Sequence, residues 1–88
     1  MRVNVIFKGN VQGVGFRYTC VMISRRYTVT GYVQNLPDGT VRVVAEGDKP
    51  EIESFIDEIH KRKGMNIRSV LKQDQPATGE FSGFRVRY

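Results

Sequence analysis

Apolar and polar residues alternate along the first segment of the chain. Val3, Val5 and Phe7 recur at every second position of residues 2–8, which is the period of a strand with one face on a core. Similar segments, rich in β-branched and aromatic residues, follow at residues 28–35, 40–46, 67–73 and 84–88. A Leu-Pro-Asp-Gly turn separates the second of these five segments from the third, so we expect a β-hairpin there.

Two other segments have the period of a helix. In the first, apolar residues stand at i, i+4, i+7 and i+11, at Phe16, Cys20, Ile23 and Tyr27. We expect the second helix to start at Asp48, with Glu51 completing a capping box and Pro50 in the first turn, and to end at Gly64. Its apolar face is formed by Ile52, Phe55, Ile56 and Ile59.

The expected order of elements is βαββαβ, the ferredoxin-like split βαβ arrangement. Two amphipathic helices on one face of a four-stranded antiparallel sheet would bury both apolar stripes, and we therefore predict an α+β sandwich. A polar loop at residues 75–82 leads to the closing strand. With 88 residues, 40% of them apolar and 26% charged, the chain fits a single domain over residues 1–88.

Charge and composition restrict the partners further. Fourteen basic and nine acidic residues give a net charge of +5, which favours small phosphorylated metabolites, nucleic acids or acidic surfaces as partners. No apolar run approaches the roughly 20 residues of a membrane span, and the first residues lack the layout of a signal peptide. Together with the single cysteine, Cys20, this leads us to expect a cytoplasmic protein without membrane contact.

The most informative stretch is residues 9–17, Gly-Asn-Val-Gln-Gly-Val-Gly-Phe-Arg, between the first strand and the first helix. Glycines allow successive backbone N–H groups to point inward, and a helix start adds unpaired N–H groups, so such a turn can bind an anion. Arg17 is unfavourable in the first turn of a helix unless an anion is bound there, and a guanidinium can hold two phosphate oxygens. The glycine spacing matches no common nucleotide loop, so a plain turn remains an alternative.

The reactive side chains are few. The single histidine and the single cysteine give no sign of a metal cluster or of a nucleophilic catalytic set. We expect His60 at the surface of a basic helix end and Cys20 in the core. A phosphate-handling enzyme without a general acid or a metal needs a good leaving group, and a carboxylate is one. Acyl phosphate hydrolysis would then require a placed water, for which Asn35 is a candidate, although Asn35 could be only a turn residue.

Residues 9–17, together with Gly31-Tyr-Val-Gln-Asn35, Gly39, Val41 and Gly47, closely resemble the two signature motifs of acylphosphatases. This resemblance implies hydrolysis of acyl phosphates to a carboxylate and inorganic phosphate, without metal or cofactor. It implies that Arg17 binds the phosphate oxygens and that Asn35 orients the attacking water. It also implies that a loop wraps the phosphoryl group with its backbone N–H groups, formed by Val11, Gln12, Gly13, Val14, Gly15 and Phe16. We expect a monomer.

Two positions depart from the pattern of the family. Asn10 stands where many members carry a basic residue, so one auxiliary charge near the loop is missing. Thr28 stands where many members have a glycine at the end of the first helix. Because a left-handed cap would strain a β-branched residue, we expect a different helix end with an effect on stability.

Two other functions remain as alternatives. The charge would suit a ferredoxin-like module that binds nucleic acid, but the strand at residues 40–46 lacks the aromatic residues on which an RNA-binding sheet stacks bases. We therefore do not expect nucleic-acid binding. The other alternative is a catalytically idle ligand or assembly domain, because acylphosphatase-like domains also occur within larger carbamoyl-handling maturation proteins.

Overall fold

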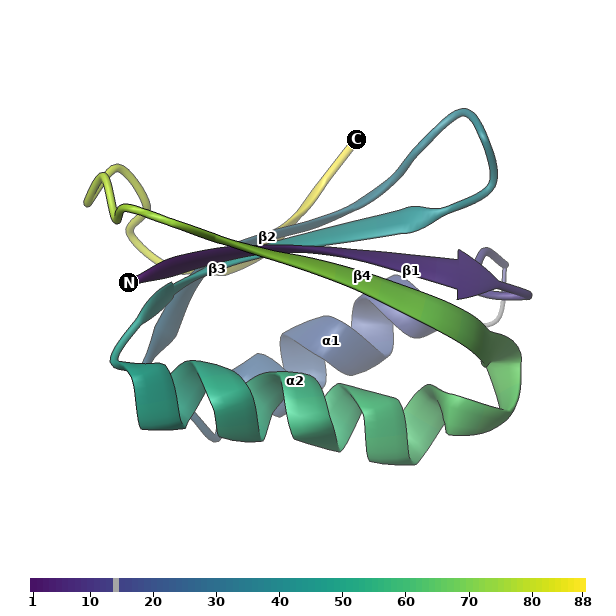
Figure 1. The fold of residues 1–88 in the computed structure, drawn as a ribbon, viewed down its shortest axis with the longest axis horizontal. Helices are drawn as coiled ribbons and strands as arrows, with labels where there is room; N and C mark the ends of the chain where they lie inside the picture. The colour runs from purple at the N-terminus through teal and green to yellow at the C-terminus, as the bar shows by residue number, and fades with distance from the viewer. Residues whose placement is uncertain (14) are drawn as a thin grey trace.

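The computed structural model describes residues 1–13 and 15–88 and forms two layers (Figure 1). Both α-helices of the described residues cover one face of the β-sheet, and neither lies on the other face. The elements within the described residues are β1 (Arg2–Gly9), α1 (Phe16–Ser24), β2 (Val29–Asn35), β3 (Val41–Gly47), α2 (Lys49–Lys63), the 3₁₀ turn η1 (Gly64–Asn66), β4 (Ile67–Gln75) and β5 (Phe84–Arg87). The predicted α+β ferredoxin-like architecture is confirmed. Neither helix in these residues offers an apolar stretch of the length that a membrane crossing needs.

The sheet differs from the prediction in the number and direction of its strands. Across the described residues it has five strands in the order β4-β1-β3-β2-β5, whereas we predicted four antiparallel strands. The additional strand, β5, lies parallel to β2, with Gly31 opposite Phe84 and Gln34 opposite Arg87. The alternation at residues 84–88 correctly indicated a strand, but the period of a strand does not say which free edge it joins. The long polar loop carries the chain from β4 at one edge to β5 at the other.

The predicted hairpin is confirmed. β2 and β3 pair antiparallel from Val29 opposite Gly47 to Asn35 opposite Val41. The turn between them is held by the Asp38 carboxylate, which accepts hydrogen bonds from the Thr40 N–H at 3.0 Å and the Thr40 hydroxyl at 2.6 Å. These bonds lower the pKa of Asp38. The turn therefore fixes the end of β2, where Asn35 is located.

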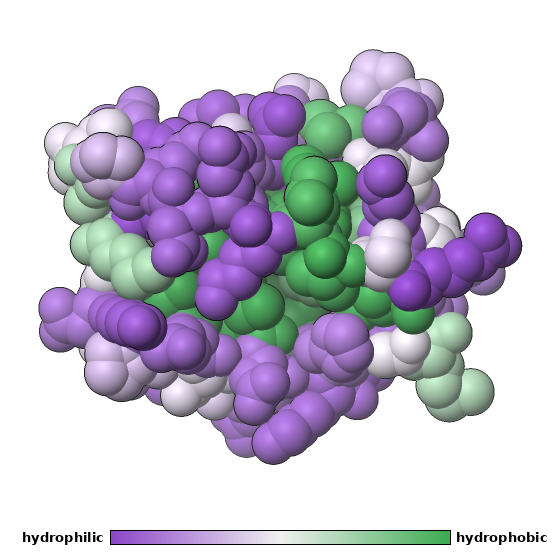
Figure 2. Space-filling view, viewed as in Figure 1, coloured by the Kyte–Doolittle hydropathy of each residue, from purple (hydrophilic) through white to green (hydrophobic). Residues whose placement is uncertain are grey.

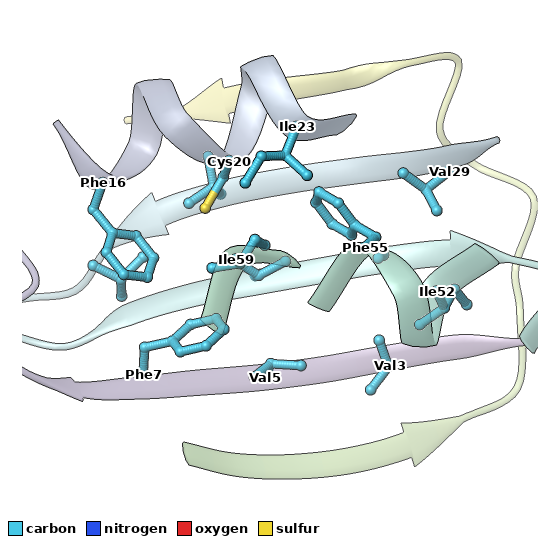
Figure 3. Packing of buried hydrophobic residues seen from close by; sticks show 14 of the residues in the cluster. Val3, Val5, Phe7, Phe16, Cys20, Ile23, Val29, Ile52, Phe55 and Ile59 are labelled. Carbon is cyan, nitrogen blue, oxygen red and sulfur yellow. The ribbon is translucent and has the colours of Figure 1, made fainter. Parts of the chain in front are cut away.

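The core fills the space between the sheet and the helices (Figure 3). Alternate residues of β1, such as Val5 and Phe7, point into this space, and both predicted helix stripes meet them there. Phe7 packs against Phe16 with ring centroids 5.2 Å apart, which attaches the first turn of α1 to the sheet. Cys20 is fully buried in the same layer, and burial raises the pKa of its thiol well above the ordinary value. Its predicted place in the core is confirmed.

The end of α1 and the start of α2 both differ in part from the prediction. α1 ends at Ser24, before Tyr27, because the next N–H groups donate hydrogen bonds to carbonyls only three residues earlier. The Arg26 N–H donates to Ile23 O at 3.0 Å, and the Tyr27 N–H donates to Ser24 O at 3.2 Å. Among the described residues only glycines have positive φ, so Thr28 avoids the left-handed conformation, as expected.

The start of α2 is the second difference. Asp48 is the N-cap residue and Pro50 lies in the first turn, but the predicted capping box does not form. The Glu51 carboxylate instead accepts a hydrogen bond from the Thr28 N–H at 2.7 Å. A capping side chain needs a free N–H nearby, and here the chain leaving α1 supplies one. Glu51 therefore connects the two helices rather than capping its own.

Candidate functional site

A cleft of about 420 Å³ opens beside the start of α1. One wall is α1, the opposite wall is β5 with the residue that follows it, and one end is formed by the loop after β1 and the last residue of β2. Arg17 and Asn35, which are distant in sequence, both line this cleft. The lining residues are Val11, Gly13, Gly15, Phe16, Arg17, Tyr18, Val21, Arg25, Asn35, Val86 and Tyr88.

The loop reaches the helix through two glycines in the left-handed region. Gly13 has φ of 77° and Gly15 has φ of 73°, values at which a side chain would be strained. A Cβ at either position would meet no atom within 4 Å, so the backbone conformation, and not crowding, requires glycine. Gly15 is the N-cap residue of α1, no side chain caps that end, and the first turn carries no acidic residue. The helix start is therefore suited to an anion.

Three other residues of the predicted loop use their side chains for structure. Val11 and Phe16 are buried in the core. The Gln12 amide donates two hydrogen bonds, each of 2.8 Å, to the carbonyls of Leu36 and Thr40. If Val11 and Phe16 contact a ligand, only their backbone can do so, and the amide nitrogen of Gln12 is already engaged. The predicted role of Val14 lies outside the described residues.

The Gln12 hydrogen bonds join the glycine loop after β1 to the hairpin that carries Asn35. Leu36 follows Asn35 directly, so the side chain of Gln12 fastens the glycine loop to the end of β2. The motif placed Gln12 in the loop but gave no sign of this bridge, because a single sequence does not show which carbonyls a glutamine amide reaches.

Asn35 presents an unsatisfied carboxamide in the cleft. Its Oδ1 atom is buried and has no hydrogen-bond partner in the described part of the chain. Buried polar atoms are nearly always paired with protein or water. Asn35 lines the cleft, so its carboxamide oxygen lacks the partner that a donor such as water would supply.

Arg17 is half-buried in the first turn of α1. Its guanidinium carbon lies 5.3 Å from the centroid of the Tyr88 ring, within the range of a cation–π contact. The ion pairs among the described residues do not include Arg17. A cation at a helix start without a neutralising carboxylate is electrostatically unfavourable, and a bound anion would reverse the sign of that interaction.

Five lining residues were not found from the sequence: Tyr18, Val21, Arg25, Val86 and Tyr88. Val21 and Arg25 stand four and eight positions after Arg17, a spacing that places them on the same side of a helix, whereas Tyr18, one position after Arg17, could not have been found in this way. The two on the opposite wall depend on the parallel position of β5, which the sequence did not indicate. His60 is exposed on α2, as predicted. No group of three or more His, Cys, Asp and Glu side chains that could hold a metal ion is present in residues 1–13 and 15–88.

Residues 3–86 match the acylphosphatase family. The chain is 44% identical to an acylphosphatase of Methanospirillum hungatei JF-1, over 98% of this chain and 96% of that protein. It is similar in structure to the acylphosphatase of Bacillus subtilis, with a TM-score of 0.88 and 26% identity, covering 99% of this chain and 98% of the other. It is also similar to part of HypF from T. kodakarensis, with a TM-score of 0.85 and 32% identity, covering 100% of this chain and 12% of that one.

The fold is an α+β sandwich of helices on one face of a sheet, and the comparisons give its family. The chain belongs to the acylphosphatase family and is an enzyme of that class.

Proposed function

We propose that this chain hydrolyses the carboxyl-phosphate bond of acyl phosphates without a metal ion, with Arg17 binding the phosphoryl group and Asn35 orienting the attacking water. The observation that carries the proposal is the shared cleft. An arginine without an ion-pair partner among the described residues, an uncapped helix start and an unpaired carboxamide oxygen all border one cavity.

The phosphoryl group would lie at the start of α1. Its oxygens would accept hydrogen bonds from the Arg17 guanidinium and from backbone N–H groups of the loop that includes Gly13 and Gly15. The Gln12 bridge to the end of β2 and the left-handed conformations of Gly13 and Gly15 support such an arrangement of donors. Preorganised donors of this kind stabilise charge in the transition state and need no reorganisation during the reaction.

The water would be held by the Asn35 carboxamide and would attack phosphorus. As the new P–O bond forms, the bond between phosphorus and the acyl oxygen breaks, and the carboxylate leaves with the bonding electrons. The proton of the water passes to a phosphoryl oxygen, so a dianionic acyl phosphate and water give a carboxylate and dihydrogen phosphate. A carboxylate with a pKa of about 4 leaves without protonation at neutral pH, which is consistent with a cleft whose described lining residues include no histidine or cysteine.

The test uses an aromatic acyl phosphate such as benzoyl phosphate, in the presence of EDTA. We expect the wild-type chain to remain active. Arg17→Ala should lower kcat/KM by about 10²–10³-fold, whereas the matched exposed variant Arg85→Ala should not. Asn35→Ala should lower kcat by about 10²-fold with little change in KM. Gln73→Ala, which removes an exposed carboxamide on β4 away from the cleft, is its control.

Stability separates a catalytic role from a structural one. Removal of the Arg17 charge from the first turn of α1 gains roughly 0.3–1 kcal/mol and loses a cation–π contact with Tyr88 of about 0.5–1 kcal/mol, so the free energy of unfolding should stay close to that of the wild type. Activity that EDTA abolishes, or near-normal turnover in either site variant, would show that the assigned mechanism is wrong.

A further inference from the structure

The cleft at the start of α1 extends beyond the part that the proposed reaction uses. The phosphoryl group and the attacking water would occupy the region of the glycine loop, Arg17 and Asn35. The whole cleft has a volume of about 420 Å³, whereas a water takes up only about 30 Å³. The rest of the lining lies further along α1 and β5 and includes Val21, Val86 and Arg25. The sequence motifs assigned no role to these three residues.

The far part of the cleft lies in the direction in which the leaving group would depart. α1 runs opposite to β2, since the helix ends at Ser24 and β2 begins soon afterwards at Val29. In Figure 3, Phe16 at the start of α1 and Val29 at the start of β2 lie at opposite ends of the view. The cleft therefore leads away from Asn35, at the end of β2, toward the end of α1. Attacking and leaving oxygens lie roughly in line across phosphorus, so a water at Asn35 directs the acyl group along the cleft.

Two arginines lie at the ends of this path. Val21 and Arg25 follow Arg17 by four and eight positions on the same side of the helix. At about 1.5 Å per residue, Arg25 stands about 12 Å further along the axis than Arg17. It directly follows α1 and keeps helical backbone angles, with φ of −66° and ψ of −15°. Val21 and, on the opposite wall, Val86 are partly buried against the core, so the cleft between the two arginines is apolar.

Arg25 is exposed and has no carboxylate partner in the described part of the chain. Its neighbour Arg26, in contrast, pairs with Glu58. The Arg25 guanidinium donates a hydrogen bond of 3.4 Å to the Met22 sulfur, which is a weak acceptor. Because Met22 precedes Arg25 by three residues, the guanidinium leans back along the helix toward the phosphoryl site. The described lining residues include no Asp or Glu, so an anion in the cleft would meet no competing carboxylate.

We propose that Arg25 is a specificity-determining residue, which favours acyl phosphates whose acyl group carries a second negative charge at its far end. The inference rests on the proposed function. With the phosphoryl group at Arg17, the body of the acyl group would lie between Val21 and Val86, and its distal anionic group would reach Arg25. A neutral acyl group of the same shape would leave Arg25 without this partner. Because Arg25 contacts neither phosphorus nor the water, the preference should appear in KM more than in kcat.

The experiment compares 4-carboxybenzoyl phosphate with its neutral amide, 4-carbamoylbenzoyl phosphate, at one low ionic strength, because salt screens exposed charges. The two substrates have the same rigid ring and acyl phosphate group and differ in charge at the far end. We expect the wild-type kcat/KM to be about five- to tenfold higher for the carboxylate, an effect between that of an exposed ion pair and that of a hydrogen bond to a charged group. Arg25→Gln should abolish this preference. Arg25→Lys keeps the charge and should retain part of it.

A matched control separates Arg25 from the net charge of the protein. Arg68→Gln removes one positive charge from β4, which lies on the face shown in Figure 2, and Arg68 is not among the residues that line the cleft. That face carries many polar side chains around a central apolar area, and the variant should keep the wild-type preference. Far-UV circular dichroism checks that each variant is folded.

A structural role of Arg25 would give a different result. A cation at the end of a helix is favourable by itself, and an arginine that only stabilises α1 would affect both substrates equally when replaced. A wild-type chain without the preference, a preference that Arg25→Gln leaves intact or Arg68→Gln also abolishes, or an equal loss for both substrates would overturn the inference. Failure of the proposed function looks different, because the wild-type chain would then hydrolyse neither substrate, and the inference would fall with it.

Discussion

The Gln12 bridge provides a prediction that connects stability with catalysis. Gln12→Ala removes two hydrogen bonds of 2.8 Å between the glycine loop and the end of β2. The acceptor carbonyls keep other donors: Leu36 O receives the Gly39 N–H at 3.1 Å, and Thr40 O receives the Leu36 N–H at 2.9 Å. No carbonyl is therefore left unpaired, and the cost is only the net value of the two lost bonds.

The size of the effect follows from these contacts. At a net 0.5–1.5 kcal/mol per bond, two bonds could contribute about 1–3 kcal/mol, and the remaining donors favour the lower half, about 1–2 kcal/mol. Loosening the loop relative to Asn35 should also lower kcat by about ten- to a hundredfold, because small displacements of catalytic groups are costly. A purely structural glutamine would affect the free energy of unfolding and leave kcat of the folded enzyme unchanged.

The assay combines urea unfolding with kcat and KM for benzoyl phosphate, measured on dilute protein well below the unfolding midpoint. Gln73→Ala, the same truncation on the exposed strand β4, is the matched control and should leave both quantities close to the wild type. If Gln12→Ala keeps the wild-type kcat, the bridge does not position the site and our reasoning about it is refuted.

Three further predictions concern charge, backbone and pH. Asn10→Lys adds a positive charge beside the loop and should lower KM for an acyl phosphate about two- to threefold at low salt, with kcat unchanged. Salt should screen this attraction, so a change in KM that does not depend on salt would contradict an electrostatic cause. Gly31→Ala should cost more than about 3 kcal/mol in urea unfolding, because a Cβ there would lie 1.8 Å from Val44 O, whereas Gly79→Ala meets no atom within 4 Å and should cost about 1 kcal/mol or less. Burial alone would raise the pKa of Glu46. The Thr78 and Gly79 N–H groups and the Thr78 hydroxyl donate hydrogen bonds to its carboxylate, and Arg2 lies beside it; together these interactions outweigh burial and lower the pKa of Glu46 below 4.5. Its contribution to stability should therefore be present above pH 4.5 and be lost as the pH falls through the lowered pKa, and Glu46→Gln should flatten that part of the pH profile.

Local patterns predicted the elements well because they report which residues must be buried. The alternation in β1 and the stripe of α1 each matched the observed core, and the Leu-Pro-Asp-Gly turn matched the observed hairpin. The strand β5 was visible as a strand, but its parallel position beside β2 was not. Strand order depends on how the loop at residues 76–83 crosses the sheet, and this information is not in the period of any one segment.

The sequence likewise predicted only part of the candidate site. The motifs indicated Arg17 and Asn35, and both line the cleft. The sequence did not indicate that Gln12 fastens the loop to the hairpin, or that Glu51 bonds Thr28 and leaves the capping box unformed. Both contacts join residues more than twenty positions apart, so each depends on tertiary structure. The side chains of β5 in the cleft were missed for the same reason.

The most direct test of the mechanism is the fate of solvent oxygen during hydrolysis of benzoyl phosphate in ¹⁸O-labelled water with EDTA. Attack on phosphorus by the water at Asn35 predicts that the label appears in inorganic phosphate and that benzoate remains unlabelled. Arg17→Ala should form labelled phosphate at a rate lower by about 10²–10³-fold. Label in benzoate would mean that water attacks the acyl carbon, and it would contradict the assignment of a phosphoryl site at the start of α1.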